Sequence, residues 1–445
     1  MLLRESHAAI THGEVQWNPA RGSVCVSNEK SFGRESLEFE IEYSPEQEAF
    51  RSEVKEWLAA NIPAGISVSP RLEEHPREEW EARRELARRL GAKGWLWLTM
   101  PQQYGGGGLS FDHALILDEE LGRYRLQVPL YHDPVAVTAA CIMVWGSQEQ
   151  KNYFLPRIFK AEVVTWLCMT EPEAGSDVAS VKTLAVRDGD EYVINGHKTF
   201  IGAEHGVDYL WTICATDPKA PRHENVSWFV IPADAPGITM MPLELMGSRV
   251  IGGSPDGVKN SIFFDNVRVP AFNLVGGENN GWKVASTLLE LEHGGGGRVA
   301  PDLFIEMLWD HVPVAKLDGG RLWDDTDQRD ALMDAHVGSE TTRLFGLRNF
   351  YLANAKRPRS YGGSQASLFR KQANLDLIHH MGRAFGYYAL TTDPEHRLMD
   401  GALEIQQRQG IIDSHPGGTM DVQKLIIARR IGVGRTSREE AGQLA

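Results

Sequence analysis

Apolar residues recur at helical spacing through the first 160 residues of the chain. After Ser44-Pro45, a pair suited to the cap and first turn of a helix, the apolar positions Phe50, Val54 and Leu58 fall on one face. Similar patterns cover Glu78–Leu90, Phe111–Leu121 and Val135–Trp145. These amphipathic segments predict an N-terminal helical domain.

The spacing changes near Leu184 to short runs rich in β-branched and aromatic residues. The runs cover Tyr192–Ile194, Thr199–Ile201, Tyr209–Ile213, Trp228–Ile231 and Ser261–Phe264. Asp188-Gly189 and Asn195-Gly196 are the strongest hairpin dipeptides and predict tight turns. We therefore expect a central antiparallel β domain.

Helical spacing returns after Gly281. It covers Asp330–Tyr351, Gln365–Phe385 and Asp421–Ile431. The predicted fold class is an α+β multidomain protein with an N-terminal helical domain, a central antiparallel β domain and a C-terminal helical bundle. The expected bounds are 1–43 for an N-terminal extension, 44–165, 166–277 and 278–445.

Composition narrows the classes of protein. Of the 445 residues 42% are hydrophobic, which excludes general disorder. The net charge of −14 argues against a protein that coats nucleic acid or an anionic membrane.

No apolar run is long enough to span a bilayer, and Arg4, Glu5 and His7 interrupt the start where a secretion signal needs an apolar segment. We expect a cytoplasmic location.

Metal, disulfide and dinucleotide motifs are weak. Cys25, Cys141, Cys168 and Cys214 are widely spaced, which is typical of reduced and mostly buried thiols. His379-His380 points its side chains about 100° apart on a helix, so no metal site is expected. The glycine runs 105–108 and 294–297 do not follow strands of a βαβ unit and are not dinucleotide fingerprints.

The most informative segment is Cys168–Ala179, at the junction of the helical and β domains. Glu171-Pro172 and Gly175-Ser176 favour a compact turn whose hydroxyls and amides can face a planar ligand. The segment resembles the flavin-contacting signature of the acyl-CoA dehydrogenase family. Other segments similar to that family, in its order, are Tyr104–Gly106, Gly146–Lys151, Leu155-Pro156, Asn195–Lys198, Phe264–Pro270 and Gly417–Gln423.

The resemblance implies an FAD-dependent acyl-CoA dehydrogenase of lipid metabolism, as in fatty acid β-oxidation. Such an enzyme removes hydrogen from Cα and Cβ of an acyl-CoA thioester and forms the 2-enoyl-CoA. A carboxylate takes the α-proton, and the β-hydrogen leaves as hydride to the flavin. The family passes its electrons to an electron-transfer flavoprotein or a similar acceptor and forms dimers or tetramers.

The catalytic carboxylate is displaced from its commonest family position. Many members carry a glutamate two residues before the threonine of the C-terminal signature, where this chain has Gly417. Another branch places it on the helix after the β domain, immediately before an arginine. Leu291-Glu292-His293 matches that position, with histidine in place of arginine. Glu292 is therefore the predicted base, and His293 is a predicted substrate contact.

Helical periodicity gives a second argument for Glu292. At about 100° per residue it shares a face with Ala285 and Leu288, whereas Glu290 falls on the polar side. A carboxylate on an apolar face is desolvated, which raises its pKa toward the range of a general base. The alternative is a buried glutamate paired with Arg298 or another cation.

The resemblance also implies the flavin contacts. Met169, Thr170 and Ser176 match residues that meet the isoalloxazine edge, and Ser176 is also a predicted substrate contact. Phe200 stands where the family has a tryptophan, and Gly202 stands where it has a serine or threonine. Phe200 can stack on the flavin, but Gly202 lacks the hydroxyl expected near N5.

A second set of cofactor contacts is expected near the C-terminus. Thr419, followed by Asp421 and apolar positions at Val422 and Leu425, suits the cap of a helix whose amino end faces the flavin or its pyrophosphate. An ordinary helix cap would give the same pattern.

Two regions depart from the family. Pro301–Gln328 has no clear counterpart of the arginine and glutamine that a second subunit contributes to the pyrophosphate, and the glycine-rich loop near Phe385–Tyr388 is altered. Either a related subunit completes a heteromeric enzyme, or a homo-oligomer has diverged. A catalytically weak or structural subunit, and a flavin oxidase or monooxygenase on the same fold, remain alternative functions. Either the glycines at 294–297 leave space for a branched or ring-bearing acyl group, or they form a flexible helix terminus, and the sequence leaves the substrate open.

Overall fold

A computed structural model describes most of the chain, in two compact units, Met1–Glu46 and Gln47–Ala445. The described residues are 15–18, 23–26, 43–63, 66, 77–124, 126, 130, 135–202, 205–243, 245–246, 259–294, 302–317, 320–354, 357 and 360–433. Side chains are described in these ranges except at 15–18, 23–26, 135, 136, 290–294, 317, 353 and 354.

The first unit contains a small β-ribbon. Strand β1 (Val15–Asn18) pairs antiparallel with β2 (Ser23–Val26). The sequence did not predict it, because four-residue strands are too short for their alternation to stand out from a polar segment.

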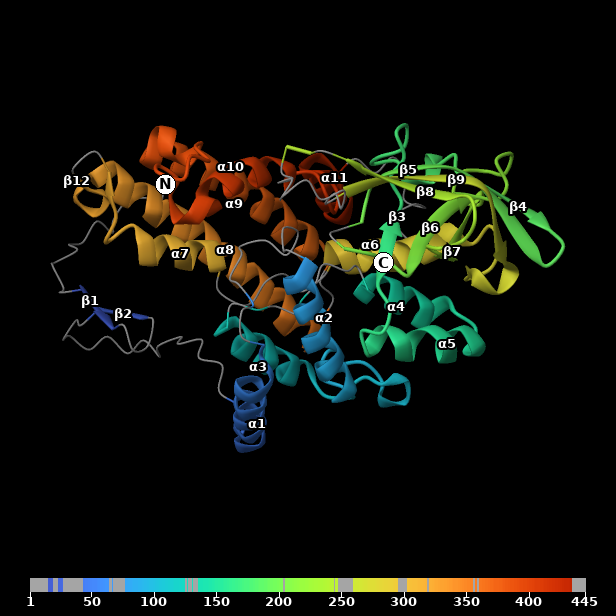
Figure 1. The fold of residues 1–445 in the computed structure, drawn as a ribbon, viewed down its shortest axis with the longest axis horizontal. Helices are drawn as coiled ribbons and strands as arrows, with labels where there is room; N and C mark the ends of the chain where they lie inside the picture. Colours follow the sequence, from blue (N-terminus) through green and yellow to red (C-terminus); the bar gives the residue numbers. More distant parts are fainter. Residues whose placement is uncertain are drawn as a thin grey trace, which may run out of the picture. The chain divides into compact units, whose positions relative to one another are not determined.

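The helices of the N-terminal domain agree with the hydrophobic pattern. They are α1 (Pro45–Asn61), α2 (Arg77–Ala92), α3 (Phe111–Gly122), α4 (Val135–Trp145) and α5 (Gln148–Phe159) (Figure 1). The predicted N-terminal helical domain is confirmed. Helix α5 was not predicted, because Pro156 lies within it and proline is a helix-breaking signal.

The central domain is one mixed sheet, coloured green to yellow in Figure 1. Its strands are β3 (Thr165–Cys168), β4 (Leu184–Asp188), β5 (Glu191–Ile201), β6 (Tyr209–Ala215), β7 (Val226–Pro232), β8 (Ile238–Leu243), β9 (Lys259–Pro270) and β10 (Leu274–Val275). The order is β10-β7-β6-β4-β5-β9-β8, with β3 also paired to β6. The predicted β domain is confirmed, but β3 and β4 each pair with β6 in parallel, in contrast to the all-antiparallel expectation.

One of the two predicted hairpin turns is wrong. Asp188-Gly189 does turn between β4 and β5, where Asp188 pairs with Glu191. Asn195-Gly196 instead lies inside β5, at a register shift in the pairing with β9. A Cβ atom at Gly196 would lie 2.4 Å from Oγ1 of Thr183, so this glycine allows a close strand approach rather than a turn.

The C-terminal part returns to helices. They are α6 (Gly281–Gly294), α7 (Leu303–His311), α8 (Thr326–Asn354), α9 (Gly362–Phe385), α10 (Ala402–Ile412) and α11 (Met420–Arg430), with a short ribbon of β11 (Lys316–Leu317) and β12 (Gly320–Arg321). The long helices α8 and α9 run side by side (Figure 1), and α10 and α11 also pack on α9. The predicted C-terminal helices are therefore confirmed.

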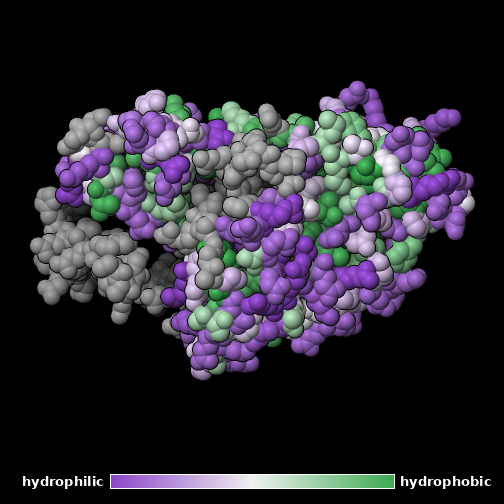
Figure 2. All heavy atoms as spheres, viewed as in Figure 1, coloured by the Kyte–Doolittle hydropathy of each residue, from purple (hydrophilic) through white to green (hydrophobic). Residues whose placement is uncertain are grey.

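Apolar side chains form three cores in the second unit. One joins helices α1–α3 to the sheet, a second joins α4, α5 and α6 to β6 and β7, and a third lies among α7–α10. In the second core, Trp211 and Trp228 are fully buried and stack with ring centroids 4.8 Å apart. Polar side chains cover much of the described surface in Figure 2. Among the described helices, none is long and apolar enough to cross a membrane.

The end of β5 is shaped by close packing against β3. Gly202 follows β5 with φ +84°, and a Cβ atom there would lie 2.5 Å from ring atoms Cδ2 and Cε3 of Trp166. Trp166 is itself buried, with 4% of its surface exposed. The indole therefore takes the space that a side chain at position 202 would need, which is why glycine stands there.

We expect Gly202→Ser to destabilise the protein more than Gly206→Ser does. Both glycines have positive φ, +84° and +89°, but no atom lies within 4 Å of a Cβ at Gly206. Backbone strain is therefore matched, and the extra loss in the free energy of unfolding at Gly202 should be about 1–3 kcal/mol from overpacking. Urea unfolding measures both variants, and equal losses would show that Trp166 does not restrict this position.

Candidate functional site

The residues that link β3 to β4 form a folded loop. Glu171 and Ala174 exchange two backbone hydrogen bonds, with N–O distances of 3.0 and 3.1 Å, around the turn at Pro172-Glu173. Met169 and Thr170, just before this turn, are half-buried, whereas Ser176, just after it, is exposed. The predicted compact turn is confirmed, and it separates Thr170 from Ser176.

A buried ion pair lies beneath this loop. Nζ of Lys198, on β5, is 2.8 Å from Oε1 of Glu171 and donates a second hydrogen bond to the Met169 carbonyl at 3.1 Å. The side chain of Lys198 is 0% exposed and that of Glu171 is 5% exposed. The backbone N–H groups of Lys182 and Thr183 also donate to the Glu171 carboxylate, at 2.6 and 2.9 Å. Each of these nearly buried charges therefore has hydrogen-bond partners within the protein.

The pKa of Glu171 reflects two opposed influences. Burial, the largest, raises the pKa, but the charge of Lys198 and the hydrogen bonds from Lys198, Lys182 and Thr183 together bring it below the ordinary value of 4.5. Because the pKa of Glu171 is lower in the folded state, its carboxylate stabilises the fold at pH values above the ordinary pKa. This stabilisation is lost as the pH falls through the lowered pKa.

The end of β5 presents an aromatic ring beside the loop. The Thr199 N–H donates to the Thr170 carbonyl at 2.9 Å, so the strand and the loop are joined at this point. Phe200 is 56% exposed, although its neighbours Thr199 and Ile201 are 8% and 2% exposed, and it has an unusual φ of +59°. The backbone thus turns a large apolar ring outward, an arrangement that suits stacking on a planar ligand.

The loop between β6 and β7 provides a second attachment. Arg222 forms two hydrogen bonds to Asp177, the residue after Ser176, at 2.8 and 2.5 Å. The ring of the adjacent His223 stacks on Trp282 of α6, with centroids 4.0 Å apart and planes 13° apart. Because Asp177 and Arg222 are exposed, this contact orders the loop at low energetic gain.

The predicted helix cap at Thr419 is confirmed. Its Oγ1 accepts a hydrogen bond from the Val422 N–H at 3.3 Å, and Gly417 and Gly418 precede it with φ of +67° and +78°. Asp421 lies in the first turn of α11, is exposed, and is 3.4 Å from Lys424. The two residues before Thr419 therefore carry no side chains, and the backbone N–H groups at the amino end of a helix favour anions.

Two buried polar side chains hold the loop before α11. Lys371 of α9 donates to the carbonyls of Asp413 and Pro416 at 3.2 and 2.5 Å. Gln423 of α11 donates to the Gly417 carbonyl at 2.8 Å. Both side-chain residues are 0% exposed. Sequence reasoning missed Lys371 and Gln423, as it missed Lys198, because a polar residue within an amphipathic pattern gives no sign that it is buried.

Helix α6 extends through the predicted base. It ends at Gly294, so positions 292 and 293 lie in its last turn. The side chains of Glu292 and His293 lie outside the described residues, as does Arg298. The loop after β3 and the end of β5 meet directly, whereas Thr419 and Asp421 belong to α11, which packs on α9.

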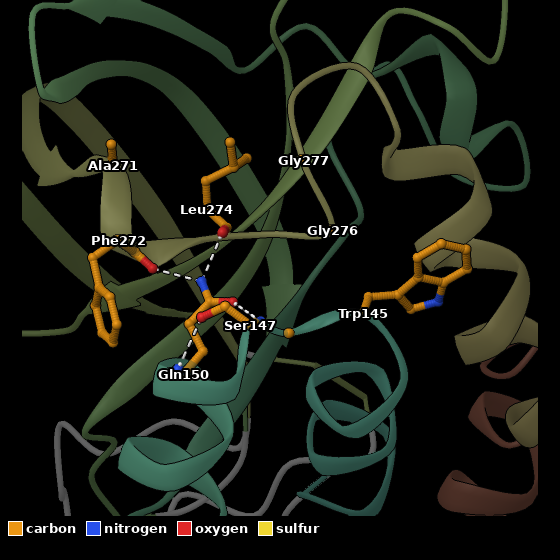
Figure 3. Close-up of a pocket in the computed structure, with 9 residues that line it drawn as sticks. Trp145, Ser147, Gln150, Ala271, Phe272, Leu274, Gly276 and Gly277 are labelled. Carbon is orange, nitrogen blue, oxygen red and sulfur yellow. Dashed lines mark hydrogen bonds between the residues drawn. The ribbon is translucent and has the colours of Figure 1, made fainter.

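A surface hollow of about 420 Å³ lies elsewhere, where α4 and α5 meet the segment before α6 (Figure 3). Gln150 reaches into this region and donates to the carbonyls of Phe272 and Leu274 at 2.6 and 2.7 Å. Its Oε1 accepts from the Ser147 N–H, which completes a capping box on α5. The predicted site residues do not line the hollow, and its contacts join α5 to the sheet.

Comparisons with known proteins agree with this arrangement. Residues 44–162 match the acyl-CoA dehydrogenase N-terminal domain, and residues 167–262 match the acyl-CoA dehydrogenase middle domain. Acyl-CoA dehydrogenase FadE29 of Mycobacterium tuberculosis (strain ATCC 25618 / H37Rv) is 30% identical over 398 residues, covering 87% of this chain and 97% of the relative.

Two solved structures share the fold. The ChsE4–ChsE5 complex from Mycobacterium tuberculosis contains a chain with 29% identity and a TM-score of 0.71, covering 89% of this chain and 100% of that chain. A protein described as the Tcur3481–Tcur3483 steroid ACAD has 27% identity and a TM-score of 0.71, with coverage of 89% and 100%. The domains, the site segments and these relatives together show that the chain belongs to the acyl-CoA dehydrogenase family, whose members are flavin-dependent oxidoreductases.

Proposed function

We propose that this protein catalyses FAD-dependent α,β-dehydrogenation of an acyl-CoA thioester. The observation that carries the proposal is the exposed ring of Phe200 beside the Thr170 backbone, on a loop whose sequence matches the family's flavin signature. An outward aromatic ring next to a half-buried threonine on a polar loop fits the edge and face of an isoalloxazine ring.

The chain offers two groups of flavin contacts. Met169, Thr170 and Ser176 would meet the edge of the ring system and Phe200 would stack on it, whereas Gly202 lacks the hydroxyl expected near N5. Thr419 and Asp421 would lie toward the flavin or its pyrophosphate at the amino end of α11. The bound flavin would supply the hydride acceptor.

Glu292 is the proposed base for the α-proton. Its position follows Leu288 by four residues and Ala285 by seven, and both are 0% exposed. The corresponding positions before Glu290 are Ser286 and Lys283, which are exposed. Helical periodicity therefore assigns position 292 to the inward face of α6 and position 290 to the outward face. His293 and Ser176 would orient the thioester.

Substitution of Glu292 by glutamine should separate chemistry from cofactor binding. We expect Glu292→Gln to keep bound flavin and to abolish bleaching of the flavin by substrate under anaerobic conditions, since the amide cannot take the α-proton. Glu290→Gln is the matched control on the same helix and should bleach like the wild type. Retained bleaching in Glu292→Gln would reject this residue as the base.

A ring-bearing acyl group is the proposed substrate class. One structural relative is described as a steroid ACAD, and the glycines at 294–297 remove side chains just beyond the proposed base. We expect thioesters with a steroid-like ring system to bleach the flavin faster than straight-chain thioesters do, with the enoyl product detected by mass. Equal or higher rates with straight chains would contradict this substrate class.

The flavin site is proposed to need a second, related subunit. Pro301–Gln328 lacks the expected pyrophosphate contacts, and one solved relative belongs to a complex described by two subunit names, ChsE4 and ChsE5. An electron-transfer flavoprotein or similar acceptor would reoxidise the assembled enzyme.

Flavin content tests this partner requirement. The chain purified alone should hold almost no FAD, and co-expression with a related subunit should restore it. Absorbance per subunit gives the occupancy. Full occupancy of the chain alone would instead support a homo-oligomer, and it would rule out a structural subunit that depends on its partner for flavin.

A further inference from the structure

We propose that Glu171 and Lys198 are positioning residues, whose buried ion pair sets the course of the flavin-facing loop before any flavin binds. The inference rests on the proposed function, because it concerns the same loop and the same strand end. Neither side chain is accessible to a ligand, at 5% and 0% exposure, so the pair would act through the backbone that it holds.

One carboxylate closes the loop at both of its ends. Glu171 stands at the start of the loop, and its two oxygens accept from the backbone N–H groups of Lys182 and Thr183, eleven and twelve residues later. The exposed residues between them, including Ser176, are thereby confined to a closed segment. Contacts within the fold therefore offset the entropic cost of closing this segment, so flavin binding does not have to offset it.

Lys198 connects this closed loop to β5, the strand that carries the exposed ring of Phe200. Its Nζ bonds both the Glu171 carboxylate and the Met169 carbonyl, and the next residue, Thr199, donates its N–H to the Thr170 carbonyl. Phe200 follows directly. The loop and the strand end proposed to meet the flavin are therefore joined by three contacts, which involve proposed flavin contacts or their neighbours in sequence.

A nearby ion pair on the surface differs from the buried pair in its exposure. Lys182 and Glu173 also approach one another, but their side chains are 71% and 67% exposed, where ion pairs contribute little. A buried pair gains little net stability over an apolar replacement, but removing one partner leaves an uncompensated charge. Such a pair is therefore better explained by the geometry that it imposes than by stability.

A matched pair of variants tests the inference on the full chain, purified in the form that binds FAD. Lys198→Met keeps most of the side-chain volume and removes the ammonium. Arg51→Met is the control, because Arg51 forms a comparably buried ion pair with Glu120, 2.7 Å long, between α1 and α3. FAD affinity is measured by fluorescence after flavin removal, and hydrogen exchange is followed in peptides covering Lys182–Thr183 and Thr199.

The expected result is a split between the two variants. Both should unfold at lower temperature, but Lys198→Met should bind FAD at least about tenfold more weakly, equivalent to about 1.4 kcal/mol, and lose protection at Lys182, Thr183 and Thr199. Arg51→Met should keep wild-type FAD affinity. Unchanged affinity in Lys198→Met, or equal weakening in both variants, would overturn the inference.

A second measurement, on the wild type, tests the inference even if Lys198→Met does not fold. In flavin-free wild type, the amides of Lys182, Thr183 and Thr199 should already be strongly protected, because the loop is set before the cofactor binds. Rapid exchange that slows only with FAD would contradict the inference. If the wild type binds no FAD, either alone or with a related subunit, the proposed function is wrong. The protection of these three amides against hydrogen exchange still tests whether the ion pair sets the loop.

Discussion

The arrangement of the site depends on one constraint, the burial of the Glu171 carboxylate against the Lys198 ammonium. Both side chains are almost fully buried, so each charge needs partners within the fold, and these are the opposite charge and backbone groups of the loop after β3. The loop, the start of β4 and the end of β5 are thereby fixed relative to one another. Phe200, which is 56% exposed, lies two residues after Lys198 at this strand end.

Much of the fold was predictable from the sequence, because helical spacing and β-branched runs record which face is buried. Helices α1–α4, α8, α9 and α11 and the strands β5, β6, β7 and β9 follow from that signal. Asn195-Gly196 shows its limit, because the same dipeptide suits a turn or a close strand approach, and only Thr183, packed against it, decides between them. Buried polar anchors such as Lys371 and Gln423 were not predictable, since their burial is a property of the tertiary structure.

The site segments were recognised from their resemblance to the family. Two positions where the chain departs from the family, Gly202 and Gly417, have different structural explanations. Gly202 is explained by packing, because Trp166 occupies the space of the missing hydroxyl-bearing side chain. Gly417 is one of two glycines of positive φ before the Thr419 cap, in a loop that Lys371 and Gln423 hold from within. A glycine there leaves the proposed proton transfer to an acid from another element, and α6 supplies Glu292 in its last turn. In this proposal, the base and the flavin contacts come from different parts of the chain.

The central claim is that this chain, with its flavin, breaks the Cα–H and Cβ–H bonds of an acyl thioester. The most direct measurement is the rate of anaerobic flavin bleaching with a substrate deuterated at Cα, at Cβ, or at both. The account predicts slower bleaching with either label and the slowest with both, because both bonds break as the flavin is reduced. Bleaching at the same rate with all labels, or no bleaching by any acyl-CoA in a flavin-loaded assembly, would contradict it.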